Sequence, residues 1–64
     1  MKRQKLMRHL RENGCLFDRE GGKHTTVHNP ATNRQSRIPR HREIKASLAR
    51  EICKQLGVSA PEER

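Results

Sequence analysis

A pair of glycines followed closely by two histidines is the part of this sequence best suited to chemistry. The segment GGKHTTVH contains Gly21, Gly22, Lys23, His24 and, four positions later, His28. A histidine side chain titrates near neutral pH, so it can take a proton from a ribose 2′-hydroxyl group or give one to a leaving oxygen. Lys23 could neutralise a phosphate, and glycines without side chains would let the phosphate approach the backbone. These are the minimum parts of a metal-free ribonuclease site.

The same residues also have plain structural interpretations. Gly21 and Gly22 are typical of a tight hairpin turn, whose central residues can need a positive φ. On one strand, His24 and His28 would lie about 13 Å apart, too far for both rings to act on one phosphate. The same distance argues against a zinc pair, and no cysteine or carboxylate spacing completes such a site. We therefore expect no metal ion and take His24 alone as the candidate catalyst.

Two amphipathic helices are expected, one near each end of the chain. The first covers residues 2–13 and is ended by Gly14, which lies where a left-handed residue is favoured. The second covers residues 42–56 and is ended by Gly57. The apolar stripes consist of Leu6, Met7 and Leu10 in the first helix, and of Ile44, Leu48, Ile52 and Leu56, flanked by Ala49 and Cys53, in the second.

Three short strands are expected between the helices. The glycine pair would join the first two strands as a hairpin, and the NPATNR turn, residues 29–34, would join the second to the third. The expected strands are residues 15–20, 23–29 and 35–39. The resulting order is α-β-β-β-α, an α+β fold. An antiparallel three-stranded sheet with both helices on one face is the economical way to bury both stripes.

Strand alternation decides which side chains lie on the open face of this sheet. If Val27 faces the helices, Thr25 faces them too. If Ile38 also points inward, its neighbour Arg37 points outward. The open face would then carry His24, Thr26, His28 and Arg37.

Length and composition limit what such a domain can do. Sixty-four residues make a single domain over 1–64, with 58–64 as a short polar tail. With one aromatic residue in the whole chain, a deep pocket for an organic cofactor is not expected. No apolar run is long enough for a membrane span or a signal peptide, so we expect a cytoplasmic protein. Cys15 and Cys53 form no CxxC pair and are expected to be free, half-buried thiols.

The charge balance predicts an anionic partner. Fifteen lysines and arginines against seven acidic residues give a formal net charge of +8, which favours nucleic acid. A membrane surface would need apolar residues that the first helix must give to the core. An acidic protein partner remains compatible. Candidate RNA-binding residues are Lys2, Arg3, Lys5, Arg8, Arg11, His28 and Arg37, although the helix residues also suit a solvated face, as do His9 and His41.

One segment imitates a DNA-binding motif. Residues 48–59 read like the first helix and turn of a helix-turn-helix. That motif needs a recognition helix after the turn, and APEER is too short and too acidic to enter a major groove. We therefore discount this interpretation.

The sequence as a whole resembles the HicA family of toxin mRNA interferases. The resemblance is carried by REGGKH at 19–24, NPATNR at 29–34, IPRHREIKASLAREICKQLGV at 38–58 and the basic opening segment, and so by nearly the whole chain. It implies a fold like that of double-stranded-RNA-binding domains and a small ribonuclease that cleaves mRNA and arrests growth until a HicB antitoxin covers it. The family's catalytic histidine maps onto His24, and its neighbouring glycine onto Gly22. Lys23 and His28 are additions from the strand geometry.

The leading interpretation is thus a toxin ribonuclease that uses His24 as general base or acid. With so few aromatic residues, RNA should be held by phosphate contacts, with modest sequence preference. The alternatives are a non-catalytic RNA-binding module or inactive toxin relic, and a purely interacting subunit whose basic surface meets an acidic partner.

Overall fold

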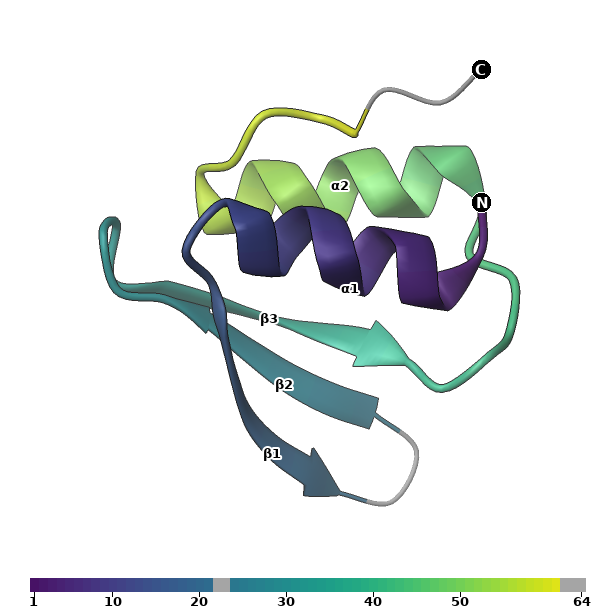
Figure 1. Cartoon of the computed structure of the whole chain (residues 1–64), viewed down its shortest axis with the longest axis horizontal. Helices are drawn as coiled ribbons and strands as arrows, with labels where there is room; N and C mark the ends of the chain where they lie inside the picture. Colours follow the sequence, from purple (N-terminus) through teal and green to yellow (C-terminus); the bar gives the residue numbers. More distant parts are fainter. Residues whose placement is uncertain (22–23, 62–64) are drawn as a thin grey trace.

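The chain folds as one sheet of three strands covered on one side by two helices. The computed structural model describes residues 1–21 and 24–61. The elements are α1 (Arg3–Glu12), β1 (Leu16–Gly21), β2 (His24–Asn29), β3 (Arg34–Pro39) and α2 (Ala46–Leu56). The predicted order and the α+β class are confirmed, and Figure 1 shows both helices on the same side of the sheet.

The sheet is an antiparallel meander in the order β1-β2-β3. Along β2, His24 lies opposite Pro39 and Thr26 lies opposite Arg37. On the other side Gly21 pairs with His24, so Gly21 belongs to β1. The prediction that Gly21 occupies a central position of the turn is therefore wrong. The rest of the predicted turn, Gly22 and Lys23, lies outside the described residues. The register places His24 at the end of the sheet where the chain leaves β3.

Apolar side chains from every layer meet between the sheet and the helices. Val27 and Ile38 are fully buried, as the alternation predicted, and Leu16 on the open face is 58% exposed. Thr25 and Asn29 are buried beside Val27 because they share its face of β2. The buried apolar residues are Leu6, Leu10, Cys15, Val27, Ile38, Ile44, Ala49, Ile52, Cys53 and Leu56.

The second helix starts four residues later than the periodicity predicted, at Ala46. Residues 42–44 instead run beside the N-terminus, where the Met1 and Ile44 backbones exchange two hydrogen bonds of 2.9 and 2.8 Å. The Arg3 amide donates to the Arg42 carbonyl oxygen at 2.9 Å. Ile44 still reaches the core, but from an extended segment. Leu48 is 38% exposed, contrary to its predicted place in the stripe.

The turn between β2 and β3 holds the end of α2. The Asn29 side-chain amide and the Thr32 hydroxyl each donate to the Leu56 carbonyl oxygen at 2.8 Å. Gly57 follows with φ 73°, the left-handed C-cap that the sequence predicted. The NPATNR segment therefore also satisfies a carbonyl that the helix end leaves without an intrahelical partner.

Both cysteines are free thiols in the core. Cys15 and Cys53 are more deeply buried than predicted, at 2% and 0% exposure. Burial raises the pKa of the Cys15 thiol. Burial also raises the pKa of the Cys53 thiol, with a smaller contribution from the charge of Cys15. Both side chains are therefore kept in the neutral, unreactive form.

Candidate active site

His24 is the first residue of β2, and its side chain is exposed. The neighbouring Thr25 is buried, while Thr26 and His28 are partly exposed and alternate with the buried Val27. Arg37 is exposed on β3, and its neighbour Ile38 is buried. The structure thus places His24, Thr26, His28 and Arg37 on the sheet face that the alternation predicted.

A small hollow of about 270 Å³ lies at His24. Its other lining residues are Pro39, Arg40 and His41, which close β3 and begin the connection to α2. From the sequence alone, His41 is interpreted as a solvated histidine and Arg40 is not singled out. Pairing His24 with Pro39 brings both residues to His24. The short NPATNR turn was the signal that could have shown this, because it fixes the register of the β2–β3 hairpin.

His28 lies elsewhere on β2. It is paired with Gln35 on one side and Leu16 on the other, near the opposite end of the strand. Its ring Nε2 lies 3.4 Å from the Asn33 Oδ1 atom, and His28 does not line the hollow at His24. This separation agrees with the prediction that the two histidines cannot serve one phosphate.

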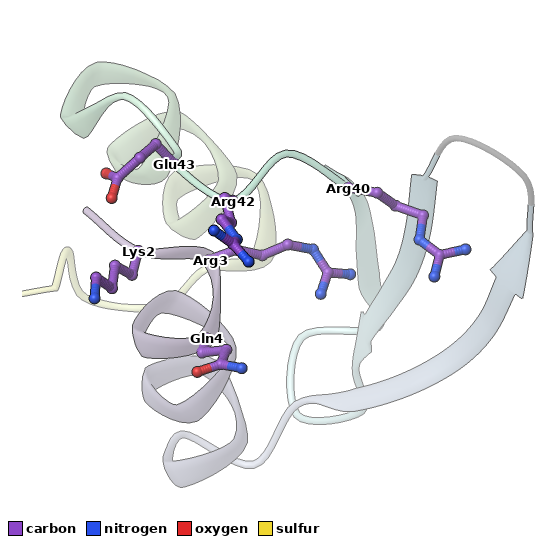
Figure 2. Close-up of a pocket in the computed structure, with 6 residues that line it drawn as sticks. All are labelled: Lys2, Arg3, Gln4, Arg40, Arg42 and Glu43. Atoms are coloured by element: carbon purple, nitrogen blue, oxygen red, sulfur yellow. The ribbon is translucent and has the colours of Figure 1, made fainter.

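A larger hollow of about 570 Å³, here called the basic basin, lies beside the first one. Its lining residues are Lys2, Arg3, Gln4, Arg40, Arg42 and Glu43, shown in Figure 2. Arg40 lines both hollows and therefore joins them. The one acidic side chain, Glu43, has its carboxylate 3.5 Å from the N-terminal ammonium group. The remaining charged side chains of the basin are cations, a composition that suits a polyanion.

The Arg3 side chain forms hydrogen bonds to β2 and β3 beside His24. Its Nε atom donates to the Pro39 carbonyl oxygen at 3.1 Å, and its Nη2 atom donates to the Thr25 hydroxyl oxygen at 2.6 Å. Pro39 is the partner of His24 across the sheet, and Thr25 is the next residue along β2. In Figure 2 the Arg3 side chain extends toward the strands, whereas that of Lys2 extends away from them. Arg3 therefore has a structural function in addition to any contact with RNA.

The other basic residues predicted to bind RNA are spread around the molecule. Lys5 and Arg8 line a separate hollow beside residues 59–61. The Arg11 guanidinium lies over the Phe17 ring, 5.3 Å from its centroid. Arg37 lies on the open face of the sheet, away from the helix layer. Of these predicted residues, Arg3 is hydrogen-bonded beside His24, Lys2 lines the neighbouring basic basin, and Arg37 shares the open sheet face with His24; Lys5, Arg8 and Arg11 lie elsewhere.

The backbone adds positive potential at the same end of the molecule. Figure 1 shows that α1 and α2 both begin near the loop that follows β3. Neither helix has an acidic residue in its first turn or a side-chain cap at its start. The partial positive charge of each helix N-terminus is therefore not offset by a nearby carboxylate within the helix. Among residues 1–21 and 24–61, no group of three or more His, Cys, Asp or Glu side chains could hold a metal ion.

Fold and site together define a small, basic α-β-β-β-α domain with an exposed histidine in an arginine-bordered hollow. The family model described as the HicA toxin of bacterial toxin–antitoxin systems matches residues 3–58, so the chain belongs to the HicA toxin family. Family membership implies a cognate antitoxin partner. Searches among curated proteins and solved structures returned no match. In the described part of the chain, no helix has the length and apolar character needed to cross a membrane.

Proposed function

We propose that this toxin is an endoribonuclease that cleaves mRNA by metal-independent acid–base catalysis with His24. The observation that carries the proposal is the exposed His24 side chain in a hollow that it shares with Arg40, in a chain of the HicA toxin family. A histidine at this place can exchange a proton with a ribose hydroxyl group or a leaving oxygen. Arg40 can stabilise the negative charge that develops on the phosphate.

RNA would be bound mainly through its phosphates. The basic basin adjoins the hollow at His24 through Arg40, so neighbouring phosphates of one strand can occupy both hollows. The chain has no tryptophan or tyrosine and a single phenylalanine, and Arg11 covers the ring of that residue, Phe17. Base stacking on aromatic side chains therefore contributes little, and sequence preference should be modest. Lys23 and Gly22 remain predicted contributors beside the catalytic turn.

Growth arrest would follow from mRNA cleavage, and a HicB-type antitoxin would neutralise the toxin. The support for this part of the proposal is the family, which implies a cognate antitoxin. A direct test is to express the toxin with and without the product of the adjacent reading frame. Restored growth together with a stable complex of the two proteins would support neutralisation. Unchanged arrest despite abundant antitoxin would argue against it.

The catalytic proposal is tested with purified protein and single-stranded RNA, in the presence and absence of a chelator. We expect wild-type protein to cleave RNA in both conditions and His24→Ala to be inactive. His28→Ala is the matched control, because it removes a histidine from the same strand but not from the hollow. Full activity of His24→Ala would contradict the proposed role. RNA binding without cleavage by wild-type protein would indicate a non-catalytic module or inactive relic instead.

A further inference from the structure

We propose that His41 is the second proton-transfer residue of the ribonuclease, so that cleavage uses a pair of histidines. The inference rests on the proposed function and assigns a residue to it. His24 and His41 line one hollow, although His24 begins β2 and His41 lies in the connection between β3 and α2. Arg40, which also lines the hollow, stands between β3 and His41.

The four histidines of the chain differ in their surroundings. The His9 Nε2 atom lies 2.8 Å from the Ser59 carbonyl oxygen, and the His28 Nε2 atom lies 3.4 Å from the Asn33 Oδ1 atom. Within residues 1–21 and 24–61, the rings of His24 and His41 have no hydrogen-bond partner. Both side chains are exposed, so both rings are available to a substrate. Only these two histidines meet at one hollow among the hollows that the structure describes.

Two histidines satisfy the proton balance of RNA cleavage without water, metal or any oxidant. One imidazole accepts the proton of the ribose 2′-hydroxyl group while that oxygen forms a bond to phosphorus. The bond from phosphorus to the 5′ oxygen breaks, and the other imidazolium donates its proton to that oxygen. The products are a 2′,3′-cyclic phosphate and a 5′-hydroxyl end. Arg40 stabilises the charge on the phosphate oxygens during this exchange.

A substrate with a modified leaving group identifies the residue that protonates it. When sulfur replaces the bridging 5′ oxygen, the leaving thiolate is stable without a proton, so loss of the general acid no longer slows cleavage. We would compare His24→Gln, His41→Gln and the control His9→Gln on ordinary RNA and on this thio-substituted RNA, because His9 lies on α1 and outside the hollow. Circular dichroism of each variant checks the fold, which these exposed or partly exposed side chains should not affect.

On ordinary RNA, we expect His24→Gln and His41→Gln each to slow cleavage by about 100-fold or more, and the control to remain within about twofold of wild type. On thio-substituted RNA, one of the two slow variants should regain most of the wild-type rate, and the other should not. Recovery of that one variant identifies the general acid. Wild-type activity of His41→Gln on ordinary RNA, or failure of both variants to recover, would overturn the histidine pair.

The result also separates this inference from the proposed function. Wild-type protein that cleaves neither substrate would overturn both. Cleavage that depends on His24 but not on His41 would overturn only the pair and leave His24 as the sole catalytic histidine. Detection of a 2′,3′-cyclic phosphate at the product end, by its resistance to phosphatase until acid treatment, would support the step as written.

Discussion

Arg3 is a cation that contributes to the architecture of the site. Its guanidinium binds the Pro39 carbonyl oxygen and the Thr25 hydroxyl, at 3.1 and 2.6 Å. From the sequence, Arg3 is predicted to bind RNA because it stands in a basic helix. The side chain is only partly exposed, however, and its hydrogen bonds connect α1 to the two strands at His24. A hydrogen bond between segments far apart in the sequence leaves no periodic signal, so this function could not be predicted.

We expect Arg3→Met to lower the free energy of unfolding by about 1–3 kcal/mol, because it leaves the Thr25 hydroxyl without its charged donor. Urea denaturation measures this decrease. Lys5→Met is the matched control, since Lys5 is an exposed cation of the same helix. Cleavage by Arg3→Met should also fall, because His24 loses part of its support. Equal stability of the Arg3 and Lys5 variants would contradict the structural function.

The buried thiols give the protein a defined response to alkaline pH. The folded state raises the pKa of Cys15 and of Cys53 above the ordinary value of 9.0. Folding therefore favours the neutral thiols, and the stability linked to them is fully present below that value and is lost as pH rises from it through the higher pKa of the folded state. We expect the free energy of unfolding to fall as the pH rises above about 9. Cys15→Ala with Cys53→Ala should show a smaller fall, although its stability at neutral pH is lower.

At the residue scale, the sequence identified one side of the hollow and missed the other. His24 could be found because it follows a glycine pair and sits in a family motif. His41 and Arg40 lie in a connection without periodicity, where side-chain positions depend on packing. Their approach to His24 follows from the β2–β3 register, which pairs His24 with Pro39. That register ends at Pro39, so it brings Arg40 and His41 to the same end of the sheet as His24 but does not fix where their side chains lie.

At the scale of elements, the helices were predictable from their apolar stripes, and the strands from the turn residues that separate them. Predicted and observed bounds of α1 differ by one residue at each end. The early start predicted for α2 has a tertiary cause. Ile44 continues the helical spacing in sequence, yet its backbone is bonded to Met1 and cannot also begin a helix. The backbone hydrogen bonds between Met1 and Ile44 thus outweigh the helical spacing of apolar residues in this segment.

Gly14 and Gly57 each follow a helix with a positive φ, but only Gly57 has a side chain packed closely against it. Comparing alanine variants of the two therefore separates the cost of backbone strain from the cost of a steric clash. Gly14 has φ 85° and would place an added Cβ in open space, whereas a Cβ on Gly57, with φ 73°, would lie 2.8 Å from the Thr32 Cγ2 atom. Gly14→Ala should cost about 1 kcal/mol of unfolding free energy from strain alone. Gly57→Ala should cost more, because Thr32 must also move. Thermal or urea denaturation of both variants measures the difference, and equal losses would show that Thr32 gives way freely.

At the scale of the whole molecule, the excess positive charge is distributed unevenly with respect to the candidate site. Lys2, Arg40 and Arg42 line the basic basin next to His24. Arg50 and Lys54 are exposed on α2 and do not line the basin. Formal net charge alone predicted an anionic partner but could not say which cations would meet it. The fold brings the start of α1 beside the loop after β3, and this places Lys2, Arg40 and Arg42 in one basin.

This arrangement predicts how RNA binding depends on salt. For single-stranded RNA, each phosphate that the protein no longer neutralises should reduce the slope of log affinity against log salt concentration by about 0.7. We expect Lys2→Gln with Arg42→Gln to weaken RNA binding and to flatten this slope. Arg50→Gln with Lys54→Gln removes the same charge from α2 and should leave the slope nearly unchanged. Fluorescence anisotropy with an uncleaved RNA analogue measures both, and equal slopes for the two double variants would exclude the basin as the binding site.

The pairing of Met1 with Ile44, residues 43 positions apart, also bears on the order of folding. Contacts across so long a stretch of chain close a large loop and tend to form late. During synthesis, residues 1–3 therefore cannot form these hydrogen bonds until residues 42–44 have been made. The end of the molecule that carries His24 is completed only then. The β2–β3 hairpin, whose contacts are local, can form first. Because the contacts of Arg3 lie at this end of the molecule and would also form late, we expect Arg3→Met to speed unfolding and to leave the folding rate nearly unchanged. The hollow at His24 would then be completed in the last step of folding.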